Sequence, residues 1–352
     1  MTSLQPLAIA AETSKDGDAN VLRASCRALF RYAICVSMAF SASLMLTPEK
    51  AYANEWPDKP VRLVVPFAAG GATDLLGRAL AVELSRLWKQ PVIVDNRPGA
   101  GGGLGAEMVA KSPPDGYTLL LASGSMFTVN PFIYPKSGYT VDSFELITKV
   151  ASGPMVVTVN SNVPARNLGE LIAYGKAHPG RINFASAGNG SQVHMAGEAF
   201  AEASGLDLTH VPYKGEGPAY SDLMAGVVQL AVANINAVTP LLKGNRIRAL
   251  AVTGLERSKL LPDVPTAAES GLPGFEFIAW FGLAVPAATP KALTGRMYEA
   301  AREAVAQPGM KRYLMDQGMN ATLSEPGTLG QDIAKESSRW KALIAKRDIR
   351  TN

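Results

Sequence analysis

Pro66-Phe67-Ala68-Ala69-Gly70-Gly71-Ala72-Thr73-Asp74 follows an apolar run, 61–65, and precedes a helical pattern that ends at Trp88. This order predicts a strand, a loop of small residues and a helix start at the C-terminal edge of a sheet. A helix start presents unpaired N–H groups and a positive partial charge, so it attracts anions. The paired glycines let the backbone approach a ligand, and Gly71 or Thr73 is the expected N-cap. A tight turn without a ligand is the alternative.

The composition indicates one or two packed α/β lobes. The chain has 352 residues, of which 47% are hydrophobic, and this is too apolar for disorder. Its 34 Lys and Arg against 30 Asp and Glu give a net charge of +4, which is too weak and dispersed to indicate a nucleic-acid partner. No stretch after residue 53 reaches eighteen apolar residues, so a transmembrane helix is not expected there.

The first 53 residues have the three parts of a secretory signal. Arg23, Arg27 and Arg31 precede an apolar run, 32–46, and Ala51-Tyr52-Ala53 supplies a small-x-small cleavage site. Cleavage after Ala53 and a periplasmic location are therefore expected, and a retained membrane anchor is the alternative. The two cysteines of the chain, Cys26 and Cys35, lie before this site, so the mature protein is expected to have no disulfide.

Apolar strands alternate with amphipathic helices from residue 54 onward, which predicts parallel strands with helices on both faces. A glycine cluster, 99–103, follows the second strand and formally matches the dinucleotide fingerprint. The acidic residue that this fingerprint requires about twenty positions later is missing, because Asp115 lies in a proline turn. We interpret the cluster as a flexible approach to a helix.

A second glycine-rich loop lies in the middle of the chain. Ser186-Ala187-Gly188-Asn189-Gly190-Ser191 follows the strand predicted at 182–185, and Ser191 has the character of an N-cap. His194 then falls at the third helical position. Two such loops in separate βα series predict a cleft with an anion-seeking helix start on each wall.

The sequence gives little support for an enzyme. The three histidines lack metal-ligand spacing, and the serine of the second loop lacks the final glycine of a nucleophile elbow. A Ser191–His194 dyad is less favoured than an N-cap beside a polar first-turn residue. We therefore expect no catalytic residue, no metal and no cofactor.

A series of short motifs resembles the Bug-type substrate-binding proteins of tripartite tricarboxylate transporters, over nearly all of the chain after the leader. They are Trp56-Pro57, the loop at 66–74, Asn96-Arg97-Pro98-Gly99-Ala100-Gly101-Gly102, Pro114-Asp115-Gly116-Tyr117-Thr118-Leu119, Ala187-Gly188-Asn189-Gly190-Ser191 with His194, Val211-Pro212-Tyr213-Lys214-Gly215, Ala249-Leu250-Ala251-Val252-Thr253, Leu261-Pro262-Asp263-Val264-Pro265-Thr266 and Trp280-Phe281-Gly282-Leu283. Each motif alone is weak, but together and in this order they are specific.

This resemblance implies an α/β, type II periplasmic-binding-protein fold, with two βα lobes around a ligand cleft and two hinge crossings. Residues 54–157 and 255–352 would form lobe 1, and residues 158–254 would form lobe 2. The implied function is capture of a small organic acid and its delivery to the integral membrane permease subunits of the transporter, by a monomer. A ligand-binding subunit of an extracytoplasmic sensing pathway is the alternative.

The resemblance also assigns residues to the ligand site. From lobe 1 these are Phe67, Ala68, Gly70, Gly71, Thr73, Asp74, Ser123 and Ser125; from lobe 2 they are Gly188, Asn189, Gly190, Ser191, His194, Lys214 and Asn234. Many proteins of this family have aspartates where this chain has Gln229 and Ala233. Because an ammonium group buried there would need a carboxylate, we expect a ligand without an amino group. Simple repacking of the strand end is the alternative.

Overall fold

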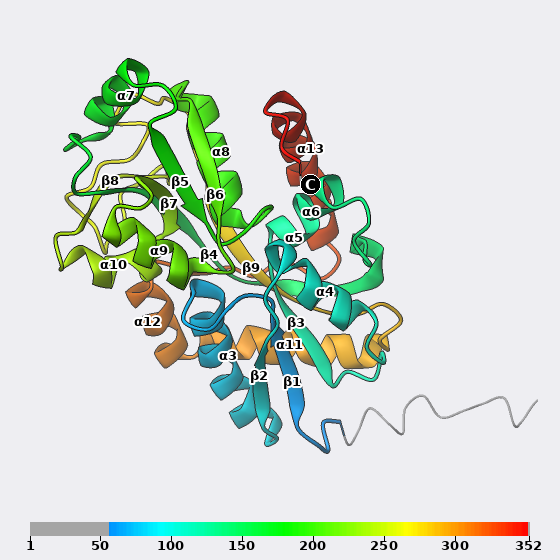
Figure 1. Ribbon diagram of the computed structural model, residues 1–352. Helices are drawn as coiled ribbons and strands as arrows, with labels where there is room; N and C mark the ends of the chain where they lie inside the picture. Colours follow the sequence, from blue (N-terminus) through cyan, green and yellow to red (C-terminus); the bar gives the residue numbers. More distant parts are fainter. Residues whose placement is uncertain (1–55, 351–352) are drawn as a thin grey trace, which may run out of the picture. The chain divides into compact units, whose positions relative to one another are not determined.

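The computed structural model describes residues 56–350, which belong to one compact unit (Figure 1). The predicted signal peptide and its cleavage site lie outside the described residues. The strands are β1 Val61–Val65, β2 Val92–Asn96, β3 Thr118–Ser123, β4 Phe144–Asn160, β5 Ile182–Ser186, β6 Leu208–Pro212, β7 Leu230–Asn234, β8 Ile247–Val252, β9 Ile278–Pro286 and β10 Asn320–Ala321. Within residues 56–350, no helix has the length and apolar character needed to cross a membrane.

The helices alternate with these strands as the sequence predicts. They are α3 Ala72–Trp88, α4 Gly103–Ala110, α5 Ser125–Thr128, α6 Asn130–Ile133, α7 Leu168–Ala177, α8 Gln192–Ser204, α9 Glu216–Ala225, α10 Ile235–Leu242, α11 Lys291–Ala306, α12 Pro308–Asp316 and α13 Leu329–Lys346, with 3₁₀ turns at Ala100–Gly102 and Val141–Ser143.

The strands form two halves that share the long strand β4. In the first half, β1 pairs in parallel with β2 and β3, and β9 joins antiparallel between β3 and β4. In the second half, β5 pairs in parallel with β6 and β7, while β7 and β8 pair antiparallel with β4. β4 changes its partner from β9 to β7 and β8 between Pro154 and Met155. Both glycine-rich loops therefore follow the C-terminal ends of parallel strands.

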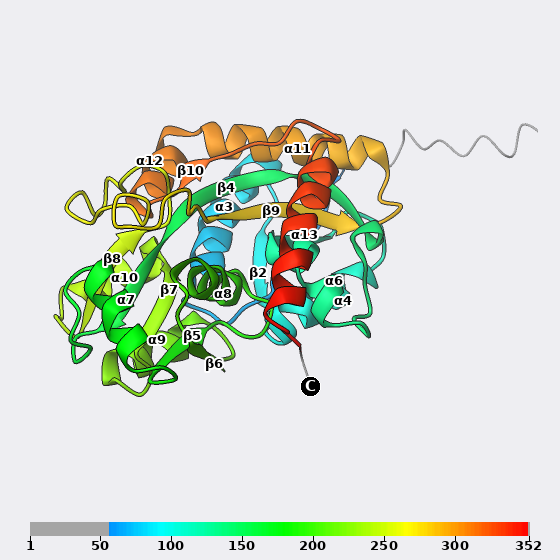
Figure 2. The same ribbon diagram turned by 90° about the horizontal axis from the view of Figure 1, so that it is seen from above.

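Helices cover both faces of each half, as the views in Figures 1 and 2 show. The alternate residues of a strand point to opposite faces, so successive residues of β1 enter different cores. Leu63 packs with α3 and α11, whereas Val64 packs in the cluster that contains residues of α4 and α13. In the second half, Phe184 packs with α8, whereas Ala185 packs with α9 and α10.

Several element bounds differ from the sequence prediction. β4 begins at Phe144, eleven residues before the predicted apolar run, because its first part mixes buried and partly exposed residues and pairs with β9. α7 begins at Leu168 and not at Pro164, since the Asn167 side chain caps it by accepting the Glu170 N–H at 2.9 Å. α9 begins at Glu216, three residues earlier than predicted, and α12 was not predicted.

The stretch between β8 and β9 contacts both halves. Leu260, Leu261 and Val264 pack against the core that contains β7 and β8, although the sequence assigns residues after 254 to lobe 1. The Thr253 N–H then donates to the Met155 carbonyl, and the Thr253 carbonyl accepts the Phe277 N–H, where the chain returns toward β9. The lobe boundaries themselves stay a prediction.

Candidate functional site

The first glycine-rich loop ends at a helix start that has no capping side chain. Gly71 is the N-cap of α3 with extended backbone angles, as one of the two sequence alternatives predicts. Gly70 has a φ of +86°, which favours glycine, and its N–H donates to Asp74 Oδ2 at 2.9 Å. Because the N-cap is a glycine, the first N–H groups of α3 are left to partners from elsewhere in the molecule.

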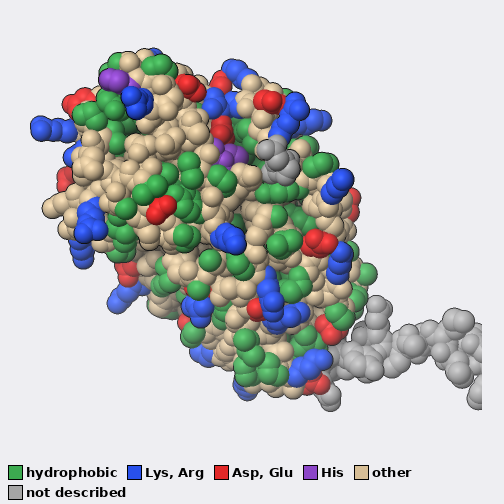
Figure 3. All heavy atoms as spheres, viewed as in Figure 1, with side chains coloured by type: hydrophobic (Ala, Val, Ile, Leu, Met, Phe, Trp, Pro, Cys, Tyr) green, Lys and Arg blue, Asp and Glu red, His purple; other side chains and the backbone are tan. Residues whose placement is uncertain are grey.

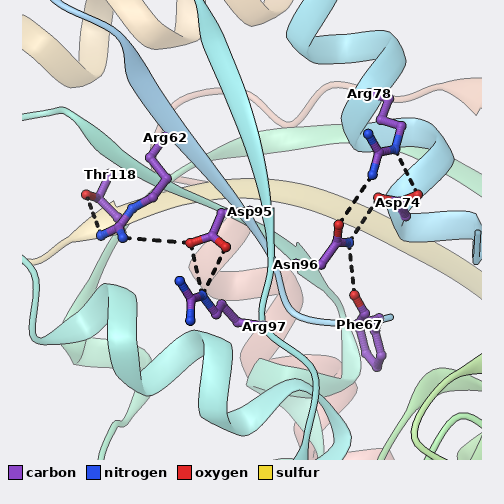
Figure 4. A network of polar contacts seen from close by, with 8 residues as sticks. All are labelled: Arg62, Phe67, Asp74, Arg78, Asp95, Asn96, Arg97 and Thr118. Atoms are coloured by element: carbon purple, nitrogen blue, oxygen red, sulfur yellow. Dashed lines mark hydrogen bonds and ion pairs between the residues drawn. The ribbon is translucent and has the colours of Figure 1, made fainter. Parts of the chain in front are cut away.

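A network of polar side chains holds this loop in place (Figure 4). The buried Asp74 carboxylate accepts from Arg78 Nε at 3.0 Å and from Asn96 Nδ2 at 2.9 Å, and Asn96 Nδ2 also donates to the Phe67 carbonyl at 3.1 Å. Burial opposes ionisation, but the hydrogen bonds from Arg78, Gly70 and Asn96 hold the pKa of Asp74 below its usual range. Asp74 therefore positions the loop and does not line the cavity described below.

The second glycine-rich loop uses its polar groups internally. The Ser191 side chain caps α8 by accepting the His194 N–H at 3.2 Å, as predicted. The Gly190 N–H donates to Nδ1 of the buried His194 ring at 3.0 Å, and the Gly188 N–H donates to Ser186 Oγ at 3.1 Å. The Ser191 hydroxyl thus bonds the backbone of His194, which matches the N-cap interpretation and not a catalytic dyad.

Stacked aromatic rings support this second loop. The ring centroids of His194 and His210 lie 3.8 Å apart, and the centroids of the stacked His210 and Phe184 rings lie 4.9 Å apart. His210 Nε2 lies 2.6 Å from Ser186 Oγ. Burial, with the neighbouring His194, lowers the pKa of His210 to about 3, so its ring is neutral at physiological pH. His210 has the structural role that the sequence favours.

The Glu198 carboxylate links the same ring stack to the segment that follows the C-terminal helix α13. Glu198 Oε1 lies 3.5 Å from His194 Nε2, and Glu198 Oε2 pairs with Arg347 just after α13. Burial works against ionisation, but the hydrogen bonds from His194 and Arg347 hold the pKa of Glu198 below its usual range.

A small cavity of about 20 Å³ lies where the two halves meet. Its lining residues are Phe67, Ala68, Gly71, Ala72, Thr73, Ser123, Ala187, Ser191, Gln192, Val193, Glu216, Asn234 and Phe281. A wider space of about 550 Å³ adjoins it at Ala187 and is lined by residues that include Gly101, Tyr134, Gly188, Asn189 and Lys214. The inner cavity holds about one water molecule, so a larger ligand requires its walls to separate.

The carboxylate of Glu216 reaches from one wall of this cavity to the other. Glu216 is the first residue of α9, and its Oε2 accepts the Ala72 N–H at the start of α3 at 2.9 Å. Its Oε1 accepts from Asn234 Nδ2. Burial raises the pKa of Glu216, and the hydrogen bonds from Ala72 and Asn234 act against this rise.

Close contacts join the two walls around the cavity. The Tyr134 hydroxyl donates to the Asn189 carbonyl at 3.0 Å, and the Trp280 N–H donates to Gln192 Oε1 at 2.9 Å. Gly101 packs so tightly that an added Cβ would lie 2.1 Å from the Asn189 carbonyl oxygen. Gly101 of the glycine cluster at 99–103 is therefore part of the contact between the walls, where a larger residue would not fit.

The structure brings most of the predicted site residues together. Phe67, Ala68, Gly71, Thr73, Ser123, Ser191 and Asn234 line the inner cavity, and Gly188, Asn189 and Lys214 line the wider space. Gly70, Asp74, Ser125, Gly190 and His194 line neither space. Ser125 Oγ lies 3.3 Å from Ser123 Oγ, and the other four bond within their own loops.

The sequence reasoning missed Ala72, Ala187, Gln192, Val193, Glu216 and Phe281 as lining residues. Ala187 and Phe281 lie inside the motifs quoted above, and Gln192 directly follows the N-cap Ser191. Their position in or next to these features was the signal that the sequence offered. Glu216 was expected in a loop, because the two glycines around it hide the helix start. An acidic residue directly after Gly215 is the signal that identifies this start.

The site offers hydrogen bonding and one carboxylate, but little for catalysis. Within residues 56–350, no group of three or more His, Cys, Asp or Glu side chains is arranged to hold a metal ion. On the face drawn in Figure 3, Lys and Arg side chains are scattered among Asp and Glu. The arrangement suits reversible binding of a small polar molecule between two walls.

Comparisons with known proteins agree with this geometry. The model of the tripartite tricarboxylate transporter family receptor matches residues 76–349. The protein BugT of Bordetella pertussis is 36% identical over 294 residues, which cover 83% of this chain and 90% of BugT.

Solved structures are also similar. The periplasmic binding protein BugD has a TM-score of 0.80 at 34% identity, over 84% of this chain and 100% of BugD. An R. palustris protein with adipate has a TM-score of 0.80 at 33% identity, over 84% of this chain and 99% of that protein. MatC of Rhodopseudomonas palustris, with bound malate, has a TM-score of 0.77 at 32% identity, over 82% of this chain and 100% of MatC.

The fold is thus the two-lobe α/β fold of periplasmic solute-binding proteins, as the motifs predict. The chain belongs to the tripartite tricarboxylate transporter receptor family, whose members include the Bug proteins.

Proposed function

We propose that this protein captures a small carboxylate between its two lobes and delivers it to the membrane permease of a tripartite tricarboxylate transporter. One observation carries the proposal: the uncapped start of α3 and the loop before it face a cavity that the second lobe closes. A carboxylate held there would receive backbone hydrogen bonds and benefit from the helix dipole.

The chemistry of similar proteins supports an organic acid as the ligand. The R. palustris protein is described with adipate and MatC with malate, and both align with more than four fifths of this chain. Lys214 lies at the wider space beside the inner cavity, where its ammonium would favour a second carboxylate of a longer acid.

The division into lobes supports capture by closure. We place lobe 1 at residues 54–157 and 255–352 and lobe 2 at residues 158–254, with crossings where β4 changes partner and where Thr253 joins Met155 to Phe277. Because the inner cavity holds about one water molecule, binding proceeds by separation and closure of these lobes.

The delivery step requires export and a membrane partner. Cleavage after Ala53 would release a periplasmic monomer that begins at Asn54, and intact-mass analysis of the secreted protein tests this directly. A product that keeps residues 1–53 and stays in the membrane would contradict it.

A thermal-shift screen followed by calorimetry tests the binding step. The acids are succinate, malate, adipate, citrate, aspartate and glutamate, with succinamide as a neutral control. At 100 times its Kd, a ligand stabilises the folded state by about 2.7 kcal/mol. Stabilisation by an acid and not by succinamide supports the proposal, whereas no response to any acid contradicts it. Loss of uptake of that acid in cells that lack the gene supports transport, and intact uptake contradicts it.

A further inference from the structure

Glu216 places a carboxylate at the meeting point of three helix starts. It is the first residue of α9, it bonds the Ala72 N–H of α3 at 2.9 Å, and it accepts from Asn234, the N-cap of α10. The positive ends of these helices favour a negative charge at this position. They also explain how the fold tolerates a carboxylate in the cavity wall.

This carboxylate has no cationic partner in the protein. Within residues 56–350, no Lys, Arg or His nitrogen lies within 4.0 Å of a Glu216 oxygen. Its two hydrogen bonds come from a backbone N–H and a neutral amide. The half-buried carboxylate thus has neutral partners alone, and a cation brought into contact with it would gain a favourable charge pair.

We propose that Glu216 is the specificity-determining residue of the cleft, and that it selects ligands that carry a cationic group, such as an ammonium, beside a carboxylate. The proposal rests on the proposed function, because it assigns the second charge of the same ligand. The carboxylate of the ligand would use the loop at 67–73, and its cationic group would contact Glu216. An acid without a cationic group would place a second negative charge close to Glu216, and the two would repel each other.

This changes the expectation drawn from β7. That expectation followed from the absence of aspartates at positions 229 and 233. Gln229 accepts the Asn183 N–H at 3.0 Å and donates to the Gly226 carbonyl at 3.2 Å, so its amide links neighbouring segments of the protein. Ala233 is fully buried. Glu216 supplies from α9 the carboxylate that β7 lacks, so the argument against an amino group no longer holds.

Matched ligand pairs test the assignment by calorimetry. L-Aspartate and succinate differ by one ammonium group, as do L-glutamate and glutarate. The wild type, Glu216→Gln and Glu256→Gln are compared; Glu256 is exposed and its substitution changes the net charge equally. We expect at least one amino acid to bind the wild type ten times or more tighter than its partner acid. Glu216→Gln should weaken its binding about thirtyfold or more, and Glu256→Gln should not.

Any other result overturns the role of Glu216, and the outcomes separate that failure from a failure of the proposed function. A wild type that prefers the acids without an amino group refutes the role of Glu216 while the proposed function stands. An amino preference that persists in Glu216→Gln refutes that role as well. If no compound of either pair binds at 10 mM, the assignment fails, and the wider acid panel then decides whether the proposed function fails too. Glu216→Gly removes the carboxylate without filling the cavity, so it repeats the test should Glu216→Gln unfold.

Discussion

The two glycine-rich loops look alike in sequence but differ in how they satisfy their backbone. The first loop leads into α3 through Gly71, which has no side chain, and the Ala72 N–H is bonded by Glu216 at the start of α9. The second leads into α8 through Ser191, whose hydroxyl accepts from the His194 N–H within the same turn. The first helix start therefore accepts a partner from a distant segment of the chain, whereas the second is largely closed by its own residues.

The supports of the loops differ in the same way. The charged side chains of Asp74 and Arg78 and the amide of Asn96 hold the first loop on the side away from the cavity. The ring of His194 holds the second loop by accepting the Gly190 N–H, and His210 stacks behind it. A glycine N-cap leaves the first N–H groups of α3 to partners from other segments, whereas the Ser191 hydroxyl already accepts the His194 N–H at the start of α8.

The largest expected effect comes from separating the walls. In Gly101→Ala, the new Cβ would lie 2.1 Å from the Asn189 carbonyl oxygen, so the lobes cannot meet as they do here. We expect a loss of affinity of about a hundredfold or more for the acid that binds the wild type best. Calorimetry measures this loss, and small-angle scattering should show a larger radius of gyration.

Gly205→Ala is the matched control for that change. Gly205 has a φ of +66° and Gly101 one of +58°, so both substitutions carry a similar backbone strain. An added Cβ at Gly205 would meet nothing within 4 Å. Equal affinity losses in the two variants would show that strain, and not contact between the walls, controls binding.

A smaller effect should follow from weakening the scaffold of the first loop. Asp74→Asn removes a buried carboxylate that accepts from Arg78, and it should cost about 2 kcal/mol of unfolding free energy at pH 7. Because the pKa of Asp74 is lowered by folding, its stabilisation is present above the unfolded value, near 3.9, and is lost as the pH falls through the folded value. Urea unfolding should therefore show the full difference at pH 7 and a smaller difference as the pH falls below about 3.9.

Asp95→Asn is the control, since Asp95 pairs with Arg62 and Arg97 in the same region (Figure 4). Both arginines are more than 40% exposed, so this change should cost less than about 1 kcal/mol. A greater loss from Asp95→Asn than from Asp74→Asn would contradict the scaffold role.

The smallest expected effect concerns the second loop, and it appears only when unfolding free energies at two pH values are compared. Burial lowers the pKa of His210 to about 3, well below its unfolded value, so the stabilisation is present above about pH 6.5 and is lost as the pH falls. Between pH 7 and 5 the wild type should lose about 1 to 2 kcal/mol more than His210→Gln. Denaturant unfolding at both values measures this. His178 is exposed, so His178→Gln should show the same change in unfolding free energy between pH 7 and 5 as the wild type. The wild-type change in His210→Gln would refute the structural role of His210.

The sequence predicts the fold better than its fine detail. β1 and α11 have the predicted bounds, because their apolar periods are regular and glycine or proline marks their ends. The first part of β4 was missed because its partner strand β9 lies 124 to 142 residues further along the chain, from the pair Pro154–Ile278 to the pair Phe144–Pro286, and leaves no local signal. Such long-range pairing is set by the tertiary fold and not by local preference.

The site was predictable where a motif carries its own chemistry. Gly71 and Ser191 are helix starts that follow from local rules, and both line the cavity. Glu216 was not predictable in this way, since its role depends on Ala72, which lies 144 residues earlier in the chain. Gly190 and His194 were expected to contact a ligand, and in the structure they bond each other; the sequence gives no sign of this bond.

The central claim is that the glycine-capped start of α3 binds the acid. Gly71 has ordinary backbone angles, and an added Cβ there would lie 3.2 Å from Glu216 Oε2, so Gly71→Val would fill the site without αL strain. Gly169→Val places the same side chain in the first turn of α7, on the exposed surface. Calorimetry of both variants with the best acid of the panel is the most direct test. The account predicts affinity at least a hundredfold weaker in Gly71→Val and unchanged in Gly169→Val; wild-type affinity in Gly71→Val would contradict it.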